Sequence, residues 1–178
     1  IFSFEKYIGH LMFSKILIYL THSEVETWQL KKHHIDSLQK AFQKSKIIHC
    51  ANSKDFLDQL PYAEAVIVWF FKKEWLEISK KLKLIATPAA GNDWIEVQPS
   101  KSLEISFGSF HGAMIAETIV GAVFYFCKAF PFSKQMQLRH KWGRIKLGSK
   151  VSSLMGAQIV IFGFGKIGVE IGKKLKPF

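Results

Sequence analysis

The chain has 178 residues, 48% of them apolar and 14% aromatic, which suffices for a hydrophobic core in one domain or in one domain and part of a second. Its formal net charge is +11, from 25 basic and 14 acidic side chains. The lysines are dispersed, largely as pairs typical of solvated helix faces, and no cluster interleaves them with aromatic side chains as an RNA-binding sheet does. The charge pattern therefore argues against a nucleic-acid partner.

The two cysteines and one long apolar stretch bear on the cellular compartment of the protein. Cys50 and Cys127 lie in apolar segments without the spacing of metal ligands, which predicts two buried free thiols, no metal site and a reducing, cytoplasmic compartment. The apolar stretch 112–132 is interrupted by Glu117 and Lys128, and neither flank resembles a signal peptide. We therefore expect a helix buried between two domains there and no membrane partner.

The first part of the chain alternates between apolar runs and amphipathic stretches. Met12 lies just before the first apolar run, so our hypothesis is a natural start at Met12, with residues 1–11 as a leader or as upstream readthrough. Short runs of this kind predict strands at 15–20, 47–50, 65–70 and 82–87. Helical spacing predicts helices at 24–44, 54–60 and 73–81, the second ended by Pro61. Alternation of strand and helix predicts an α/β fold with a parallel sheet and right-handed crossovers.

The second part of the chain is predicted to contain fewer strands than the first. A strand is predicted at 103–107, followed by a long helix from about residue 113 to 130 that ends at Pro131. Residues 138–148 are expected to form a polar connector, residues 158–162 an apolar strand, and residues 166–176 a helix.

A glycine motif lies between these last two elements. Gly163, Gly165 and Gly168 fit the pattern G-x-G-x-x-G after an apolar run and before a helix, which is the setting of a dinucleotide-binding turn. Gly163 would permit the tight turn, Gly165 the approach of backbone N–H groups to a pyrophosphate, and Gly168 the close packing of helix and strand. An ordinary strand-to-helix turn with tolerated glycines is the alternative. The acidic residue expected roughly twenty positions on would lie beyond Phe178, so NAD and NADP are not distinguished.

Four blocks in this order resemble the D-isomer-specific 2-hydroxyacid dehydrogenases. Residues 84–95 resemble the family's loop ending in G-x-D-x-I, residues 111–130 its long interdomain helix with an Ala-Glu pair, Trp142 its connector tryptophan, and residues 154–178 the beginning of its nucleotide-binding domain. The resemblance implies a flavodoxin-like parallel-sheet substrate domain over residues 1–108. It implies that residues 109–178 form the interdomain helix and the first βα unit of a Rossmann NAD-binding domain.

The resemblance also implies sites. Backbone N–H groups at Ala90 and Gly91 would hold the substrate carboxylate, although a plain strand-ending turn remains an alternative. His111 stands where many members carry an Asn that orients substrate, and it could equally be a loop histidine without a role. Lys166 and Ile167, with the three glycines, match the positions that contact the cofactor, NAD or NADP.

The implied function is NAD(P)-dependent hydride transfer between nicotinamide and a 2-hydroxy or 2-keto acid by a homodimer. In the family the catalytic Arg, carboxylate and His follow the glycine motif, and the ten residues after Gly168 contain none of them. No catalytic residue is therefore assigned in this chain, which is expected to be a truncated, inactive form. The alternative is a non-catalytic flavodoxin-like interaction or dimerisation module derived from such an enzyme.

Overall fold

The computed structural model describes residues 13–22 and 24–178. The proposed start at Met12 and the leader before it lie outside the described residues. The chain divides into two compact units, Ile1–Ser109 and Phe110–Phe178, and each is described by itself.

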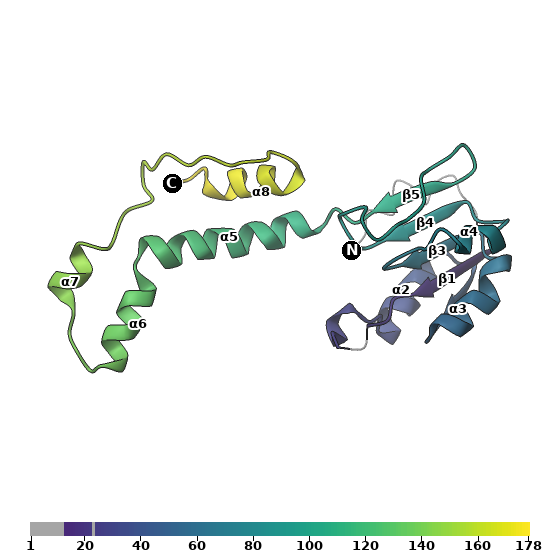
Figure 1. The fold of residues 1–178 in the computed structure, drawn as a ribbon, viewed down its shortest axis with the longest axis horizontal. Coiled ribbons are helices and arrows are strands. Elements are labelled where there is room, and N and C mark those ends of the chain that lie inside the picture. Colours follow the sequence, from purple (N-terminus) through teal and green to yellow (C-terminus); the bar gives the residue numbers. More distant parts are fainter. Residues whose placement is uncertain (1–12, 23) are drawn as a thin grey trace. The chain divides into compact units, whose positions relative to one another are not determined.

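The first unit is built on a five-stranded sheet, whose strand arrows all point the same way in Figure 1. Its strands are β1 (Lys15–Tyr19), β2 (Lys46–His49), β3 (Ala65–Val68), β4 (Leu84–Thr87) and β5 (Glu104–Phe107). All neighbouring pairs are parallel and the order is β2-β1-β3-β4-β5, the flavodoxin-like order. The predicted α/β fold with a flavodoxin-like parallel sheet is confirmed. The carboxyl ends of all five strands therefore lie at one edge, where ligands bind in this class of fold.

Helices pack on both faces of this sheet. The helices of this unit are η1 (Glu26–Trp28), α2 (Lys32–Ala41), α3 (Ser53–Gln59), η2 (Leu60–Tyr62) and α4 (Trp75–Ile78). Side chains alternate between faces along a strand, so Leu17 joins the core beneath α3 and α4, with Phe56 and Trp75. Ile16 and Ile18 join the opposite core, against which α2 packs its apolar residues.

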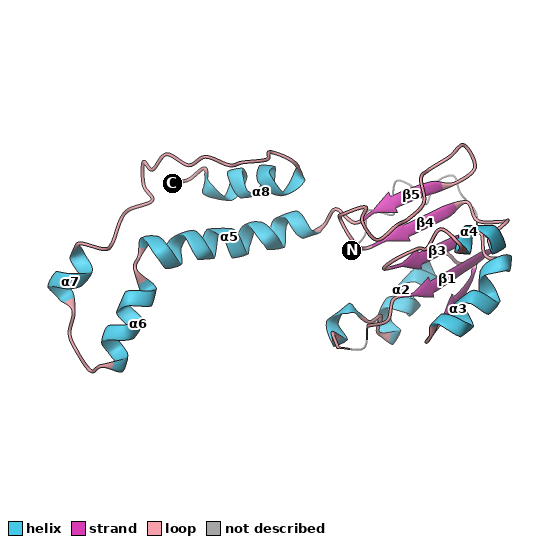
Figure 2. Cartoon of the chain, in the orientation of Figure 1, coloured by secondary structure: helices cyan, strands magenta, loops and turns pink. Residues whose placement is uncertain are grey.

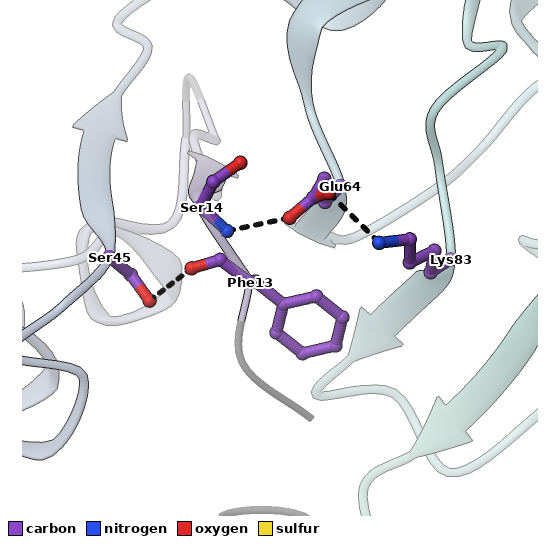
Figure 3. A network of polar contacts seen from close by, with 5 residues as sticks. All are labelled: Phe13, Ser14, Ser45, Glu64 and Lys83. Atoms are coloured by element: carbon purple, nitrogen blue, oxygen red, sulfur yellow. Dashed lines mark hydrogen bonds and ion pairs between the residues drawn. The ribbon is translucent and has the colours of Figure 1, made fainter. Parts of the chain in front are cut away.

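Polar groups tie together the amino-terminal edge of the sheet, opposite the edge formed by the carboxyl ends of the strands (Figure 3). The carboxylate of Glu64, directly before β3, accepts hydrogen bonds from the Ser14 backbone N–H at 2.6 Å and from the Lys83 ammonium at 2.9 Å. The hydroxyl of Ser45 donates to the carbonyl oxygen of Phe13. The backbone hydrogen bond, followed by the Lys83 contact, lowers the pKa of Glu64 to about 2.

The second unit is helical in its described residues (Figure 2). It contains α5 (His111–Cys127), α6 (Phe130–Leu138), α7 (Arg144–Gly148) and α8 (Lys166–Leu175). Helices α5 and α8 lie side by side and run in the same direction, as Figure 1 shows. The Glu117 carboxylate meets the Lys174 ammonium at 3.1 Å, and the rings of Phe124 and Phe178 stand 5.1 Å apart at the other end.

Several predicted elements differ from the observed ones. The helix predicted over 24–44 is instead η1 and α2, separated by an extended break. Residues 158–162, predicted as a strand, form no strand, because no neighbouring strand pairs with them in the described part of the second unit.

The long helix also differs from its prediction. It ends at Cys127, since Ala129 adopts a left-handed conformation (φ 51°), and Pro131 lies in the first turn of α6. The connector predicted over 138–148 contains α7. Rather than being buried, α5 buries only Gly112 and Ala116 among its residues.

Among the described helices, none is by itself long and apolar enough to cross a bilayer. Helices α5 and α6, which are bent by 59° relative to each other, have together the length and composition that a broken span would need.

Candidate functional site

The loop after β4 carries two of the predicted substrate-binding residues at the carboxyl edge of the sheet. Ala90 and Gly91 are both exposed there, and the hydroxyl of buried Thr87 accepts a hydrogen bond from the Ala89 N–H at 3.2 Å. A Cβ on Gly91 would lie 3.3 Å from Oδ2 of Asp93. The small residues therefore leave this stretch of backbone open to a ligand.

The base of the same loop is held by β5. The Gly108 N–H donates to the Ala89 carbonyl oxygen at 2.9 Å. A Cβ on Gly108 would overlap the backbone of Pro88, so a glycine is required at this close approach. Gly108 was not singled out from the sequence, because nothing in its local pattern marks a contact made across the sheet edge.

The glycine motif forms a turn that leads into α8. Gly163 has φ 86°, a left-handed conformation that favours glycine. A Cβ on Gly168 would overlap the Gly163 carbonyl oxygen, whereas a Cβ on Gly165 would meet no atom within 4 Å. Gly165 and Lys166 are exposed at the amino end of α8, whose unpaired N–H groups suit an anion. The turn thus combines close packing at Gly168 with open space at Gly165.

His111 is the first residue of α5, and the structure brings this end of α5 to the glycine turn. A Cβ on the adjacent Gly112 would lie 3.4 Å from the Lys166 carbonyl oxygen and 3.8 Å from Cα of Ile167. The His111 ring stacks on Phe110 at 4.0 Å, and its Nδ1 is buried without a hydrogen-bond partner. His111, predicted to face the substrate, is therefore the neighbour of Gly112. Gly112 in turn packs against Lys166 and Ile167, which are predicted to face the cofactor.

The predicted residues thus form two groups. Ala90 and Gly91 share one loop of the first unit, while His111 and the glycine motif with Lys166 and Ile167 come together in the second unit. Gly112 was missed, although its place one residue after a predicted site residue could have indicated it. Within residues 13–22 and 24–178, no group of three or more His, Cys, Asp or Glu side chains is arranged to hold a metal ion.

Comparison with known proteins gives relatives of one kind. No family model matches the chain. It is 24% identical over 167 residues to a formate dehydrogenase of Candida boidinii, covering 91% of this chain and 40% of that protein. It is 30% identical over 106 residues to a hydroxypyruvate reductase of Thermotoga maritima, covering 58% of this chain and 34% of that protein. The chain therefore spans less than half the length of these curated relatives.

Solved structures show the same fold. An NAD-dependent formate dehydrogenase from Staphylococcus aureus, in complex with NAD, matches 92% of this chain and 52% of its own with a TM-score of 0.63 at 19% identity. A D-isomer-specific 2-hydroxyacid dehydrogenase family protein from Aeromonas salmonicida matches 92% of this chain and 51% of its own, with a TM-score of 0.67 at 19% identity. These findings confirm the resemblance predicted from the four sequence blocks: the proteins to which the chain is similar include formate dehydrogenases and a D-isomer-specific 2-hydroxyacid dehydrogenase family protein.

Proposed function

We propose that this chain supplies the substrate-binding domain and the first part of the nucleotide-binding domain of an NAD(P)-dependent oxidoreductase acting on a small 2-hydroxy or 2-keto acid. One observation carries the proposal most directly. The G-x-G-x-x-G turn has a left-handed Gly163, no room for a side chain at Gly168 and open space at Gly165, the combination that a pyrophosphate-binding turn needs.

The residues of the chain fit the cofactor as follows. The backbone N–H groups at Gly165 and Lys166 would donate to the pyrophosphate at the amino end of α8, and the Lys166 ammonium would add a positive charge. The nicotinamide, when bound, supplies the group that exchanges a hydride with the substrate carbon. NAD and NADP both remain candidates, because the residue that would meet the ribose 2′ position is not among those assigned.

The residues assigned to the substrate would bind the 2-hydroxy or 2-keto acid and orient it. The N–H groups of Ala90 and Gly91 would hold the acid's carboxylate, which the small side chains leave accessible. The unsatisfied Nδ1 of His111 would find a polar partner on the substrate or cofactor, which would remove the cost of leaving it unpaired. The formate dehydrogenases among the relatives make formate a second acid to assay beside the 2-keto acids.

The cofactor site can be tested with one substitution that leaves the fold intact. A Gly165→Val side chain enters open space, so the protein should fold normally while the side chain blocks the pyrophosphate. Calorimetric titration with NAD⁺ should show affinity reduced by about tenfold or more. Gly121→Ala, an exposed glycine of α5 that also has open space around it, is the matched control and should bind NAD⁺ as the unmodified chain does. Equal NAD⁺ affinity in all three proteins would overturn the assignment.

A second candidate function is a non-catalytic dimerisation module, and the surface of α5 favours it. Apolar side chains on this helix are exposed, among them Met114 at 64% and Phe126 at 70%. Exposed apolar side chains that gather on one helix can form an interaction site. Light scattering during size exclusion should give twice the chain mass if α5 pairs with a second copy, and Phe126→Ser should restore the single-chain mass. A single-chain mass for the unmodified protein would exclude this module.

A further inference from the structure

Three tryptophans meet at the carboxyl edge of the sheet. Trp28 lies in η1 after β1, Trp69 directly follows β3, and Trp94 lies in the loop after β4. Their ring centroids are 5.1 Å apart for Trp28 and Trp69, 6.1 Å for Trp28 and Trp94, and 6.3 Å for Trp69 and Trp94. The imidazole of His22 stands edge-on to Trp28 at 4.9 Å. We call these three tryptophans the indole cluster.

Backbone hydrogen bonds hold the cluster in place. The indole N–H of Trp69 donates to the Trp28 carbonyl oxygen at 3.1 Å. The Phe71 N–H donates to the Trp94 carbonyl oxygen at 2.9 Å, which fixes the loop after β4 against the residues that follow β3. These hydrogen bonds help to position the rings, in addition to the packing of the rings on one another.

Two rings of the cluster are nevertheless exposed to solvent, whereas Trp69 is half-buried against the core. Trp28 is 38% exposed and Trp94 44%, whereas Trp75, a core tryptophan of the same unit, is 8% exposed. Rings whose only role was to fill a core would be covered as Trp75 is. An exposed group of large aromatic side chains on a rigid scaffold is typical of a binding surface.

The cluster adjoins the loop assigned to the substrate carboxylate. The Thr87 hydroxyl donates to the Trp69 carbonyl oxygen at 3.4 Å and accepts from the Ala89 N–H at 3.2 Å, so one buried side chain joins both features. Trp94 belongs to the same loop as Ala90 and Gly91. An acid whose carboxylate bound at Ala90 and Gly91 would therefore have the indole cluster beside it on the same sheet edge.

We propose that the indole cluster receives the side chain of the acid and selects substrates with a large apolar, preferably aromatic, side chain. This inference rests on the proposed function and specifies its substrate class. The rings are inclined to one another by 36°, 55° and 71°, so together they present both faces and edges. Aromatic rings bind one another in offset-stacked and edge-to-face arrangements, both of which this surface offers to a phenyl group.

The indole N–H signals of the ¹⁵N-labelled chain provide the test, since each of the five tryptophans gives one signal. Trp75 in the core and Trp142 in the other unit serve as internal references. We expect D-3-phenyllactate to shift the signals of the indole cluster without shifting those references. It should also bind about tenfold more tightly than D-lactate, which carries the same carboxylate and hydroxyl but only a methyl group.

Two variants separate recognition of the side chain from folding. Trp94→Leu replaces an exposed loop residue, and Trp28→Leu replaces the exposed ring that lies nearest to both others; both should remove the preference for phenyllactate while D-lactate still shifts the Ala90 and Gly91 amide signals. Equal affinity for the two acids in the unmodified chain, or shifts at Ala90 and Gly91 with a silent indole cluster, would overturn this inference alone. Failure of both acids to shift the Ala90 and Gly91 amides would overturn the proposed substrate site as well.

Discussion

A Cβ atom on Gly168 would overlap the carbonyl oxygen of Gly163, so the first turn of α8 packs directly on the turn that precedes it. This contact fixes the amino end of α8 behind the exposed backbone of Gly165. The geometry of the candidate cofactor site therefore depends on the absence of a side chain at Gly168.

Gly168→Ala should destabilise the second unit by about 1–3 kcal/mol, because the added methyl group forces the Gly163 turn and α8 apart. Urea unfolding followed by circular dichroism would measure the change. Gly165→Ala is the matched control, since its Cβ meets no atom within 4 Å, and it should unfold like the unmodified chain. Equal stability of the two variants would show that α8 does not pack on the Gly163 turn.

Gly108→Ala should disturb the candidate substrate loop through its base at Pro88. The added Cβ would overlap the Pro88 backbone, and relief of this overlap must move the residues leading to Ala90 and Gly91. In a ¹H–¹⁵N spectrum the amide signals of Ala90 and Gly91 should shift more than those of β1 and β2. Gly148→Ala, which adds a Cβ in open space, should leave them unchanged.

The Glu64 network predicts a particular dependence of stability on pH. The folded-state pKa of Glu64 is depressed from 4.5 to about 2, first by the hydrogen bond from the Ser14 N–H and then by Lys83. Its stabilising contribution, about 1–2 kcal/mol given the solvent exposure of Lys83, is therefore present above pH 4.5 and lost as the pH falls toward 2. In Glu64→Gln this part of the acid-induced loss of unfolding free energy should disappear. A variant with the same pH profile as the unmodified chain would contradict the assignment.

Cys50 should react slowly with thiol reagents. It is 1% exposed, and burial, followed by the nearby Asp55 carboxylate, raises the pKa of its thiol to about 11, so little thiolate is present near neutral pH. Half-buried Cys127 is the internal comparison. Mass spectrometry after brief exposure to iodoacetamide should show modification of Cys127 before Cys50. Faster modification of Cys50 would place that residue outside the core of the first unit.

The sheet was predictable because its central strands are buried on both faces. β3 is a continuous apolar run in the sequence and β4 is apolar up to Thr87, and all four residues of each are buried in the structure. The same pattern at residues 158–162 predicted a strand that does not form, since periodicity reports a tendency to be buried, whereas a strand also requires a neighbour to pair with. Pro131 was interpreted as the end of a helix, although proline is equally suited to the first turn of the next one.

The candidate site was only partly predictable, because some of its residues are brought together by contacts between segments that are far apart in the sequence. The glycine motif is local, and its pattern and spacing suffice to indicate it. Trp28, Trp69 and Trp94 come from three separate segments and meet only because β1, β3 and β4 are neighbours in the sheet. The contact of Gly112 with α8 likewise depends on the side-by-side packing of two helices far apart in the sequence.

The most direct test of the account is a ¹H–¹⁵N spectrum of the chain titrated separately with D-lactate and with NAD⁺. We predict that D-lactate shifts the amide signals of Ala90 and Gly91, and that NAD⁺ shifts those of Gly163, Gly165 and Lys166 at the amino end of α8. The two ligands would then identify one binding site in each of the two units. If NAD⁺ leaves the glycine turn unchanged and D-lactate leaves the loop after β4 unchanged, the chain does not carry these sites and the proposed function is wrong.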